Sequence, residues 1–399
     1  MGNREMDMRA LVLGGGRFQT GLIRRLREKG IWSIVVDISD GCPGKNLADQ
    51  FVRVDTNDAP ALKKIGEEYR VDLVITDQTD RLVPVAAEVS RQLGLKGLGL
   101  DLARRFTDKH EMLLRLNVLG TPIPDFKEVS SQKEALSWAA QNGYPVLLKP
   151  KQSQSAVGVI KVDNDRELEQ AFGRTMAESK DGKILVEEFI DGEEISVEGF
   201  SLNGKYHLLA VGEKEHYPEN PCITSRIAYP PRFDDELIEI IRKNAARVVE
   251  GLGLQDGLSH GEYILRDGIP WFLEVAARGG GNHIADMILP HTSGMDVYGV
   301  IIDLAMGKTV IMPQLLQRAA VLEWLDFSPG KVAEIRGVDQ VVNEGLAHFI
   351  ELSFQPGDII QPPTDGRGRL GYFVSYGDSR DEVDQKAARV KELVQVIFG

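Results

Sequence analysis

Two glutamates and an arginine, close together in the chain, could hold a metal ion and a polyphosphate. Glu262 and Glu274 lie in HGEYIL and WFLEV, segments typical of neighbouring strands, and Arg278 follows directly before three glycines. Two carboxylates on one face with a guanidinium beyond them suit a divalent cation carrying phosphates better than a hydrophobic core. Hard oxygen ligands favour Mg²⁺ or Mn²⁺ over zinc. The alternative is that both glutamates face solvent, as strand carboxylates commonly do.

The connection between these two strands decides whether the glutamates can share a cation. Asp267-Gly268 predicts a hairpin turn. A two-residue turn pairs Arg266 with Ile269 and leaves Glu262 and Glu274 on opposite faces of the sheet. A three-residue connection or a β-bulge sets them face to face. A shared metal site therefore requires one of those two arrangements.

Other segments could bind a nucleotide. Lys149 ends the short strand YPVLLKP before the polar loop KQSQSAVGV, so one cation and several backbone N–H groups could surround the same phosphates. Glu194 follows a turn at positions 191–192 and is placed to accept hydrogen bonds from a diol such as ribose, while the backbone at Glu188 and Ile190 could contact an adenine edge. The alternatives are a surface hairpin with a solvated lysine, and acids that are merely solvated.

Alternating strands and helices at the N-terminus predict a parallel sheet. Strands are expected over 10–16, 34–37 and 73–76, with helices over 18–29 and 59–69, which indicates a Rossmann-like domain. Gly14, Gly16 and Asp37 could suggest a dinucleotide site. However, Gln19 stands where the third glycine of G-x-G-x-x-G is required, so a tight turn after the first strand is favoured over nicotinamide binding.

The middle of the chain predicts further helices and one long loop. Helices are expected over 108–119, 132–141, 166–176 and 236–250, the last capped by the Asp234-Asp235 pair, and a strand over 184–187. Residues 213–229 are polar and proline-rich, which predicts an irregular loop of the binding or lid type. We expect Lys214 and Arg226 in this loop to hold a substrate carboxylate.

Composition limits the function classes. The chain has 399 residues, enough for two or three domains, with 42% hydrophobic and 27% charged residues. Its formal net charge of −13 opposes broad binding to nucleic acid or to anionic membranes. Two cysteines are too few for a disulfide framework, and no apolar run precedes the first strand or is long enough to span a membrane. We therefore expect a cytoplasmic protein.

These motifs, taken in order, carry a family resemblance. Lys109, Lys149, the Ser/Gly loop, VEEFIDGEE, HGEYIL and FLEVAAR together resemble the ATP-grasp superfamily of carboxylate–amine ligases. The match covers most of the chain, and its specificity lies in the ordered set rather than in any single motif. It implies an α/β protein with a Rossmann-like N-terminal domain (1–105), two α+β subdomains that clasp ATP (106–190 and 191–312) and a small C-terminal lobe (313–399).

The resemblance also implies roles for individual residues. Lys109 and Lys149 would contact ATP phosphates, under a lid that includes Ser153, Ser155 and Gly158. Glu187, Glu188 and Ile190 would bracket the adenine and Glu194 the ribose; Glu262 and Glu274 would ligate Mg²⁺ or Mn²⁺; and Arg278 would steady an acyl phosphate and the tetrahedral state after it. Gly280, Gly281, Asn282 and His283 are further candidates for substrate contact.

One position departs from the family pattern. The family usually has asparagine two residues after the second metal glutamate, and this chain has Ala276 there. A second fully ligated metal would then need water or Asn282 as a substitute. Residues 278–286 (RGGGNHIAD) and the C-terminal segment are similar to those of L-amino-acid (dipeptide) ligases, whose C-terminal lobe resembles that of biotin carboxylases.

The function implied is ATP-dependent joining of a carboxylate, an amino acid or similar acid, to an amine through an acyl phosphate. Small-molecule acid and amine substrates are the expected partners, and a homodimer is a further expectation. Two alternatives stay open: a bicarbonate-activating carboxylase or purine-pathway relative, and an ATP-binding regulator without catalysis, for which Ala276 is the support.

Overall fold

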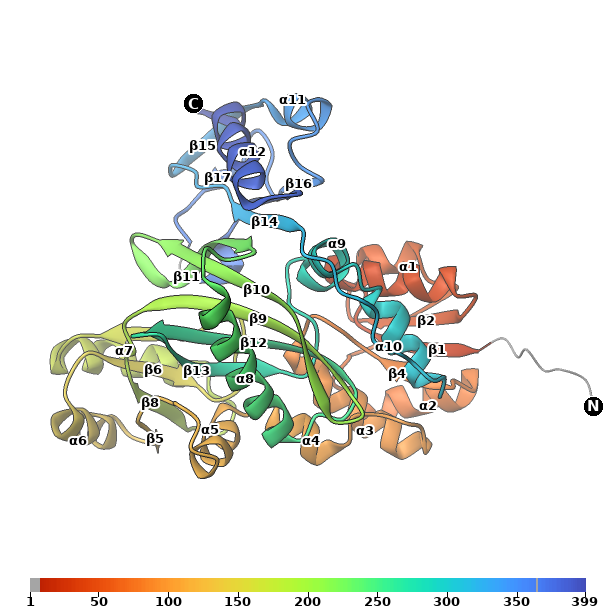
Figure 1. Cartoon of the computed structure of the whole chain (residues 1–399), viewed down its shortest axis with the longest axis horizontal. Coiled ribbons are helices and arrows are strands. Elements are labelled where there is room, and N and C mark those ends of the chain that lie inside the picture. The colour runs from red at the N-terminus through yellow and green to blue at the C-terminus, as the bar shows by residue number, and fades with distance from the viewer. Residues whose placement is uncertain (1–7, 364) are drawn as a thin grey trace, which may run out of the picture.

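The structure is a computed structural model that describes residues 8–363 and 365–399. Residues 1–7 lie outside the described residues; they belong to the predicted first domain and to the stretch before the first strand, where no apolar run was expected. Figure 1 shows the N-terminal domain at one end, a small sheet at the other, a large sheet between them and the C-terminal lobe to one side. Within the described residues, no helix combines the length and apolar character needed to cross a membrane.

The N-terminal domain is a parallel sheet flanked by helices, as predicted. Its strand order is β3-β2-β1-β4, with all pairs parallel. The strands are β1 (Arg9–Leu13), β2 (Trp32–Asp37), β3 (Gln50–Arg53) and β4 (Leu73–Ile75). The helices are η1 (Arg17–Gln19), α1 (Thr20–Glu28), η2 (Pro43–Asn46), α2 (Ala59–Tyr69), η3 (Asp80–Leu82), α3 (Val83–Leu93) and α4 (Leu100–Arg105). Apolar runs such as ALVL in β1 are buried on both faces, which is typical of parallel strands.

The glycines after β1 form a tight turn rather than a dinucleotide fingerprint. Gly14 has φ 90°, and the Gly15 N–H donates to Asp37 at 2.8 Å, so this carboxylate caps the turn. Gln19 is buried, and its Nε2 donates to the backbone carbonyl of Asp77 at 2.8 Å. The side chain that breaks the glycine pattern therefore ties β1 to the loop after β4.

A small antiparallel sheet follows, with strand order β5-β8-β6-β7. Its strands are β5 (Phe126–Val129), β6 (Val146–Pro150), β7 (Ile160–Val162) and β8 (Ile184–Glu188), and its helices are α6 (Gln132–Asn142) and α7 (Asp165–Ala177), while α5 (Lys109–Val118) leads into it. Each helix begins at a side-chain cap of the type that satisfies free N–H groups: Asp108 for α5, Ser131 for α6 and Asn164 for α7. These helices match the predicted ones to within one residue at each end.

The large sheet has eight strands in the order β13-β12-β9-β10-β11-β14-β18-β16. They are β9 (Glu193–Leu202), β10 (Lys205–Tyr217), β11 (Asn220–Tyr229), β12 (Gly257–Arg266), β13 (Ile269–Ala276), β14 (Ala319–Trp324), β16 (Phe349–Leu352) and β18 (Gly371–Gly377). The associated helices are α8 (Asp235–Leu252), capped by Asp234, then η4 (Ile284–Ile288), α9 (Leu289–Ser293) and α10 (Val297–Ala305). A three-stranded sheet of β17 (Ile359–Ile360), β15 (Gly330–Arg336) and β19 (Gln395–Phe398), with α11 (Val338–Asn343), η5 (Gly366–Gly368) and α12 (Arg380–Leu393), completes the C-terminal lobe.

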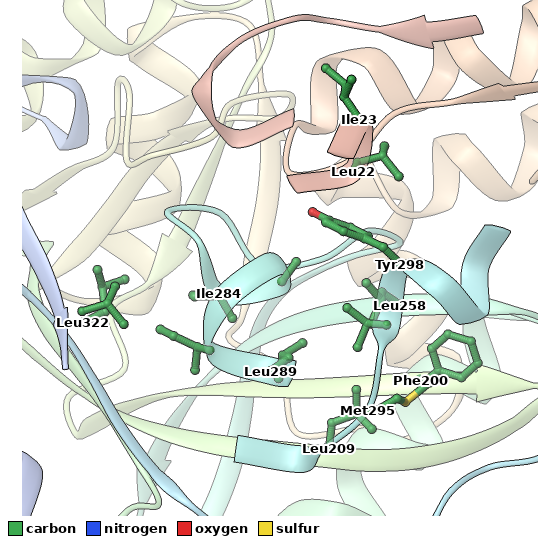
Figure 2. Packing of buried hydrophobic residues seen from close by; sticks show 14 of the residues in the cluster. Leu22, Ile23, Phe200, Leu209, Leu258, Ile284, Leu289, Met295, Tyr298 and Leu322 are labelled. Atoms are coloured by element: carbon green, nitrogen blue, oxygen red, sulfur yellow. The ribbon is translucent and has the colours of Figure 1, made fainter. Parts of the chain in front are cut away.

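Both faces of the large sheet are buried. Ile195 and Val197 of β9 pack with α5 and α8, whereas Phe200 points to the other face and joins α1, η4, α9 and α10. Figure 2 shows Leu22 and Ile23 of α1 in one cluster with Leu258, Ile284 and Tyr298. This shared core fixes the N-terminal domain against the large sheet.

The sheet is continuous across the predicted boundary at residue 312. β14 pairs with β11 on one side and with β18 on the other, so strands of the C-terminal lobe extend the large sheet. The domain boundaries stay predictions, but the lobe shares a hydrogen-bonded ladder with the large subdomain.

Candidate active site

The hairpin β12–β13 brings the two glutamates face to face. Its turn has two residues, since Arg266 pairs with Ile269, and this register alone would separate the glutamates. A β-bulge between Glu262 and Tyr263 shifts the register by one residue, so that Glu262 pairs with Glu274. Of the two arrangements that a shared site requires, the structure has the bulge.

Lysines neutralise both glutamates. Lys109 Nζ lies 2.7 Å from Glu274 Oε2, and Lys214 Nζ lies 2.5 Å from Glu262 Oε1 while also contacting Glu194. Burial alone would raise the pKa of Glu262, but Lys214 and then His260 outweigh it, and the pKa lies well below its ordinary value. The carboxylate of Glu262 is therefore held ionised, the form that a cation needs.

Lys149 and Glu187 form a second, more deeply buried pair. Their Nζ and Oε2 atoms are 2.7 Å apart, and the side chains are only 5% and 1% exposed. Burial raises the pKa of Glu187 despite Lys149. One oxygen of the Glu187 side chain accepts a hydrogen bond from the Lys149 ammonium and so orients this lysine. The other oxygen has no hydrogen-bond partner among the described residues.

Most of the predicted site residues line one cavity of about 380 Å³ between the small sheet β5-β8-β6-β7 and the eight-stranded sheet. The predicted residues on its walls are Lys109, Lys149, Ser153, Ser155, Glu187, Glu188, Ile190, Glu194, Lys214, Glu262, Glu274, Arg278, Gly281 and Asn282. Strands β6, β8, β9, β10, β12 and β13 therefore contribute to a single site. Ala276, at the position where the resemblance implies asparagine, is buried and is not among the residues that line the cavity.

The loop 153–158 is held from three directions. Lys109 Nζ donates to the Ser153 carbonyl at 2.7 Å, and the Asp80 N–H donates to the Gln154 side chain at 3.1 Å. From the C-terminal lobe, the Gly366 N–H donates to the Ser155 carbonyl at 3.1 Å. Gly158 is not on the cavity wall. It has φ 73°, and a Cβ there would lie 2.9 Å from Pro150, so its role is to let the loop return to β7.

Arg278 is positioned by the N-terminal domain. Its Nε and Nη2 atoms each donate to Asp80 at 2.8 Å, a bidentate pair in which the arginine side chain is 10% exposed. Burial alone would lower the pKa of Arg278, but Asp80 reverses this and raises it. The same loop holds the next residue, because the Gly279 N–H donates to Asp77 at 2.8 Å.

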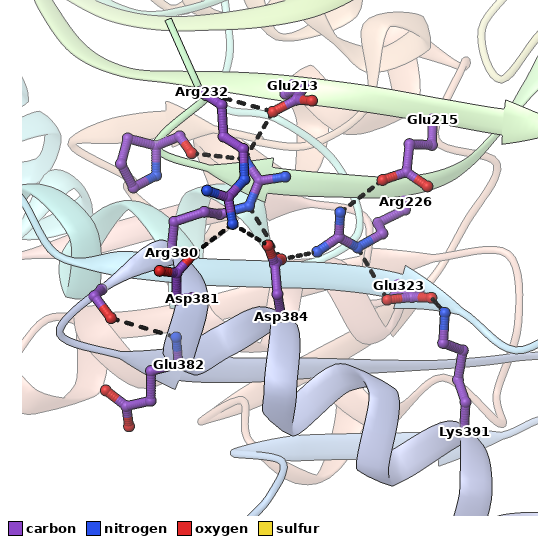
Figure 3. Close-up of polar contacts among 12 residues, drawn as sticks. Glu213, Glu215, Arg226, Arg232, Glu323, Arg380, Asp381, Glu382, Asp384 and Lys391 are labelled. Carbon is purple, nitrogen blue, oxygen red and sulfur yellow. Dashed lines mark hydrogen bonds and ion pairs between the residues drawn. The ribbon is translucent and has the colours of Figure 1, made fainter.

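Two predictions about the segment 213–229 are wrong. It is a hairpin made of the end of β10 and of β11, not an irregular loop, because alternate residues such as Ile223 and Ile227 are buried in the sheet core. Lys214 does line the cavity, but Arg226 lies outside it. Figure 3 shows Arg226 between Glu215, Glu323 and Asp384, so this arginine joins the sheet to α12.

Two further candidates are structural. His283 is 3% exposed and pairs through Nδ1 with Asp286 at 2.9 Å, away from the cavity wall. Gly280 allows close packing, since a Cβ there would lie 2.8 Å from Ile284. Their neighbours Gly281 and Asn282 do face the cavity.

Four residues at the site were missed from the sequence. His260 lies two positions before Glu262 on one strand face and contacts Glu198 at 2.8 Å, a spacing that the strand period could have indicated. Asp80 follows the carboxyl end of β4, where ligands gather in parallel sheets. His216, which contacts Glu194 at 2.8 Å, and Arg369, which comes from the C-terminal lobe, gave no signal of their own.

Comparisons with known proteins match two parts of the chain. A family model described as an ATP-grasp domain matches residues 142–286, and one described as L-amino acid ligase C-terminal domain 2 matches residues 324–399. The alanine–anticapsin ligase of Bacillus subtilis (strain 168) is 27% identical over 295 residues, which cover 68% of this chain and 60% of that protein. The formate-dependent phosphoribosylglycinamide formyltransferase of Synechococcus sp. (strain CC9902) is 23% identical over 98% of this chain and 97% of its own length.

Among solved structures, the L-amino acid ligase from Bacillus licheniformis has the same fold, with a TM-score of 0.84 and 21% identity over 99% of this chain and all of that one. The phosphoribosylglycinamide synthetase from Anaerococcus prevotii gives a TM-score of 0.76 at 21% identity over 98% of this chain and all of that one. Residues 142–286 therefore carry an ATP-grasp domain, and residues 324–399 carry L-amino acid ligase C-terminal domain 2.

Proposed function

We propose that this protein uses MgATP to join an amino acid, or a similar acid, to an amine. The observation that carries the proposal is the bulge that sets Glu262 opposite Glu274 at a cavity whose other walls hold Lys109, Lys149 and Arg278. Acidic ligands for a cation and basic groups for phosphates thus converge on one site. The whole protein's substrates are proposals, since the chain spans 60% of the alanine–anticapsin ligase that it matches.

The nucleotide is assigned to the part of the cavity between the two sheets. Glu188, at the end of β8, and Ile190, in the segment that links β8 to β9, are proposed to contact the adenine, and Glu194 the ribose. Lys109 and Lys149 are assigned to the phosphates, with Glu187 orienting Lys149. The loop containing Ser153 and Ser155 would cover the phosphates, and its anchor on Lys109 supports that placement.

The two glutamates fit a magnesium ion. Lys214 and Lys109 each contact one oxygen, so Glu262 Oε2 and Glu274 Oε1 have no hydrogen-bond partner among the described residues. Two carboxylates are too few for a closed protein cage, but Mg²⁺ in nucleotide sites takes its other ligands from phosphates and water. When bound, Mg²⁺ would neutralise phosphate charge. Asn282, on the same cavity wall, is the candidate that replaces the asparagine absent at Ala276.

The reaction needs positioning and charge neutralisation more than a nucleophilic side chain. A carboxylate oxygen of the acid bonds to the γ-phosphorus of ATP as the bond to the bridging oxygen breaks, which gives an acyl phosphate and ADP. The neutral amine nitrogen then bonds to the acyl carbon. Phosphate leaves with the electron pair of the broken carbon–oxygen bond and takes the proton that nitrogen loses. Arg278, fixed by Asp80, is assigned to the charge that develops on the acyl oxygens.

The test is ADP and phosphate release from MgATP in the presence of pairs of amino acids. Release should require both an acid and an amine, and mass spectrometry should detect the amide. Glu262→Gln and Glu274→Gln should each abolish turnover. ADP release with bicarbonate as the sole added substrate would favour a carboxylase instead. A tight MgATP complex without phosphate release in any mixture would favour a regulator. Cytoplasmic location and a homodimer stay expectations that fractionation and light scattering can check.

A further inference from the structure

Among the described residues, one basic side chain on the cavity wall has no carboxylate within 4.0 Å. Seven lysine, arginine and histidine side chains line the cavity, and six of them have a carboxylate within 4.0 Å. The pairs are Lys109 with Glu274, Lys149 with Glu187, Lys214 with Glu194 and Glu262, His216 with Glu194, His260 with Glu198, and Arg278 with Asp80. The seventh is Arg369, which has no such partner among residues 8–363 and 365–399.

Arg369 is nevertheless held in a fixed position. It precedes β18, and its Nη1 donates to the Thr224 carbonyl of β11 at 2.9 Å, while its Nε donates to the Gly366 carbonyl at 3.0 Å. Its guanidinium carbon lies 3.8 Å from the centre of the Trp324 ring. The guanidinium therefore lies against an aromatic wall, and its remaining N–H groups have no hydrogen-bond partner within the described part of the chain.

The surroundings make an unpaired cation costly. The apolar side chains that line the same cavity include Phe18, Ile223, Ile227, Ile284 and Trp324. Burial lowers the pKa of Arg369 to about 10, so the side chain remains charged at neutral pH but is partly desolvated. A half-buried, partly desolvated charge without a partner is unfavourable, and a guanidinium fork matches a carboxylate in two parallel hydrogen bonds.

We infer that Arg369, stacked on Trp324, binds a free carboxylate on the amine substrate and so selects amines that carry a carboxylate beside the nitrogen. This inference rests on the proposed ligase function. The reacting carboxylate of the acid is consumed when the acyl phosphate forms, and its phosphate partner lies with Arg278 and the glutamates. An amino acid acting as the nucleophile keeps its own carboxylate throughout the reaction, and anchoring that group fixes the direction of the nitrogen.

The experiment compares each L-amino acid with its carboxamide as the amine, with ADP release and product mass as readouts. Hydroxylamine serves as a second, small nucleophile that traps the acyl phosphate as a hydroxamate. The native enzyme should prefer the amino acid over its amide by about 10- to 100-fold in kcat/KM, the effect expected of charged hydrogen bonds. In Arg369→Gln, the KM for the amino acid should rise by about 10- to 100-fold. The fall in kcat/KM with the amino acid should be at least tenfold larger than the fall in kcat/KM with hydroxylamine.

Arg367→Gln is the matched control. Arg367 lies in the same turn, is exposed and pairs with Asp365 at 2.7 Å, so its replacement should leave the preference for amino acids over amides unchanged. Arg369→Lys is a second variant that keeps the charge and loses the fork, and it should give an intermediate KM. It also decides the question if Arg369→Gln does not fold.

The outcomes separate the two proposals. Failure of the native enzyme to form a hydroxamate from any acid would overturn the ligase function and this inference with it. Hydroxamate formation together with equal use of amino acids and amides would overturn the role of Arg369 alone. So would an unchanged KM in both Arg369 variants, or an Arg369 effect that depends on a second carboxylate of the acid rather than on the amine.

Discussion

The ion pair between Arg278 and Asp80 gives the sharpest test of how the site is positioned. Asp80→Asn keeps the shape of the side chain but removes its charge and one of the two acceptors that Arg278 uses at 2.8 Å. Breaking a buried pair costs about 3–5 kcal/mol, and a hydrogen bond to a charged group contributes about 1.5–3 kcal/mol. Since the Asp80 side chain is 22% exposed, and Asn retains one acceptor, we expect a loss of about 2 kcal/mol in the free energy of unfolding.

The catalytic effect should be of similar size. If Arg278 loses its orientation to the same extent, kcat/KM for hydroxamate formation should fall about 30-fold, because about 1.4 kcal/mol corresponds to a factor of ten. Urea denaturation and the hydroxamate assay measure the two quantities. Glu88→Gln is the control, since Arg91 contacts Glu88 with the same two-point geometry, but the Arg91 side chain is 61% exposed, and exposed ion pairs contribute little. A rate for Asp80→Asn within twofold of the native enzyme would refute the positioning role.

The pH dependence has a defined sign. Burial acts to raise the pKa of Asp80, but Arg278 outweighs it, and the pKa lies below its ordinary value of 3.8. A carboxyl group with a lowered pKa stabilises the fold fully above its unfolded pKa and loses that contribution as the pH falls through the folded value. The stability difference between native protein and Asp80→Asn should therefore be constant above about pH 5 and shrink below the ordinary value.

Three other changes test separate parts of the site. Saturating ATP at 100 times Kd should stabilise the fold by about 2.7 kcal/mol and so raise the melting temperature. Glu262→Gln and Glu274→Gln should remove the Mg²⁺-dependent part of that rise, and an undiminished rise would contradict the metal assignment. Gly279→Ala should destabilise the fold, because its Cβ would lie 2.3 Å from another Cβ, whereas Gly281→Ala, which meets nothing within 4 Å, should leave the melting temperature unchanged. Cys222, whose pKa burial raises to about 11, should resist alkylation at pH 8, and rapid labelling in the folded protein would show that this wall of the cavity opens.

Local patterns predicted the elements and the acidic end of the site well. Helix α8 begins where the predicted cap at Asp234 places it, because a cap is a local interaction. From the sequence, the face-to-face arrangement of Glu262 and Glu274 could be predicted only on the condition of a three-residue turn or a β-bulge. The sequence could not decide between these two, because a bulge depends on the neighbouring strand β9 as well as on the hairpin. Asp80 and Arg369 reach the cavity from parts of the chain far from the glutamates, and no short-range pattern encodes such a contact.

The prediction of an irregular loop over residues 213–229 was wrong for a related reason. Proline and polar residues favour a loop locally, but β11 pairs with β10 on one side and with β14 on the other. The polar side chain of Arg226 is then satisfied by acids on neighbouring strands and on α12 rather than by solvent or substrate. Tertiary pairing overrides local preference here.

The uninterrupted eight-stranded sheet determines which part of the molecule can open. Because the C-terminal lobe shares backbone hydrogen bonds with β11, it cannot swing away without breaking that ladder. The small sheet β5-β8-β6-β7 has no strand in common with the large one and is connected to it after β8 through the short stretch before β9. Entry and exit of nucleotide should therefore occur by rotation of the small sheet about residues 189–192. The proposed adenine contact at Ile190 lies within this pivot, so the base would bind where the enclosing walls move least.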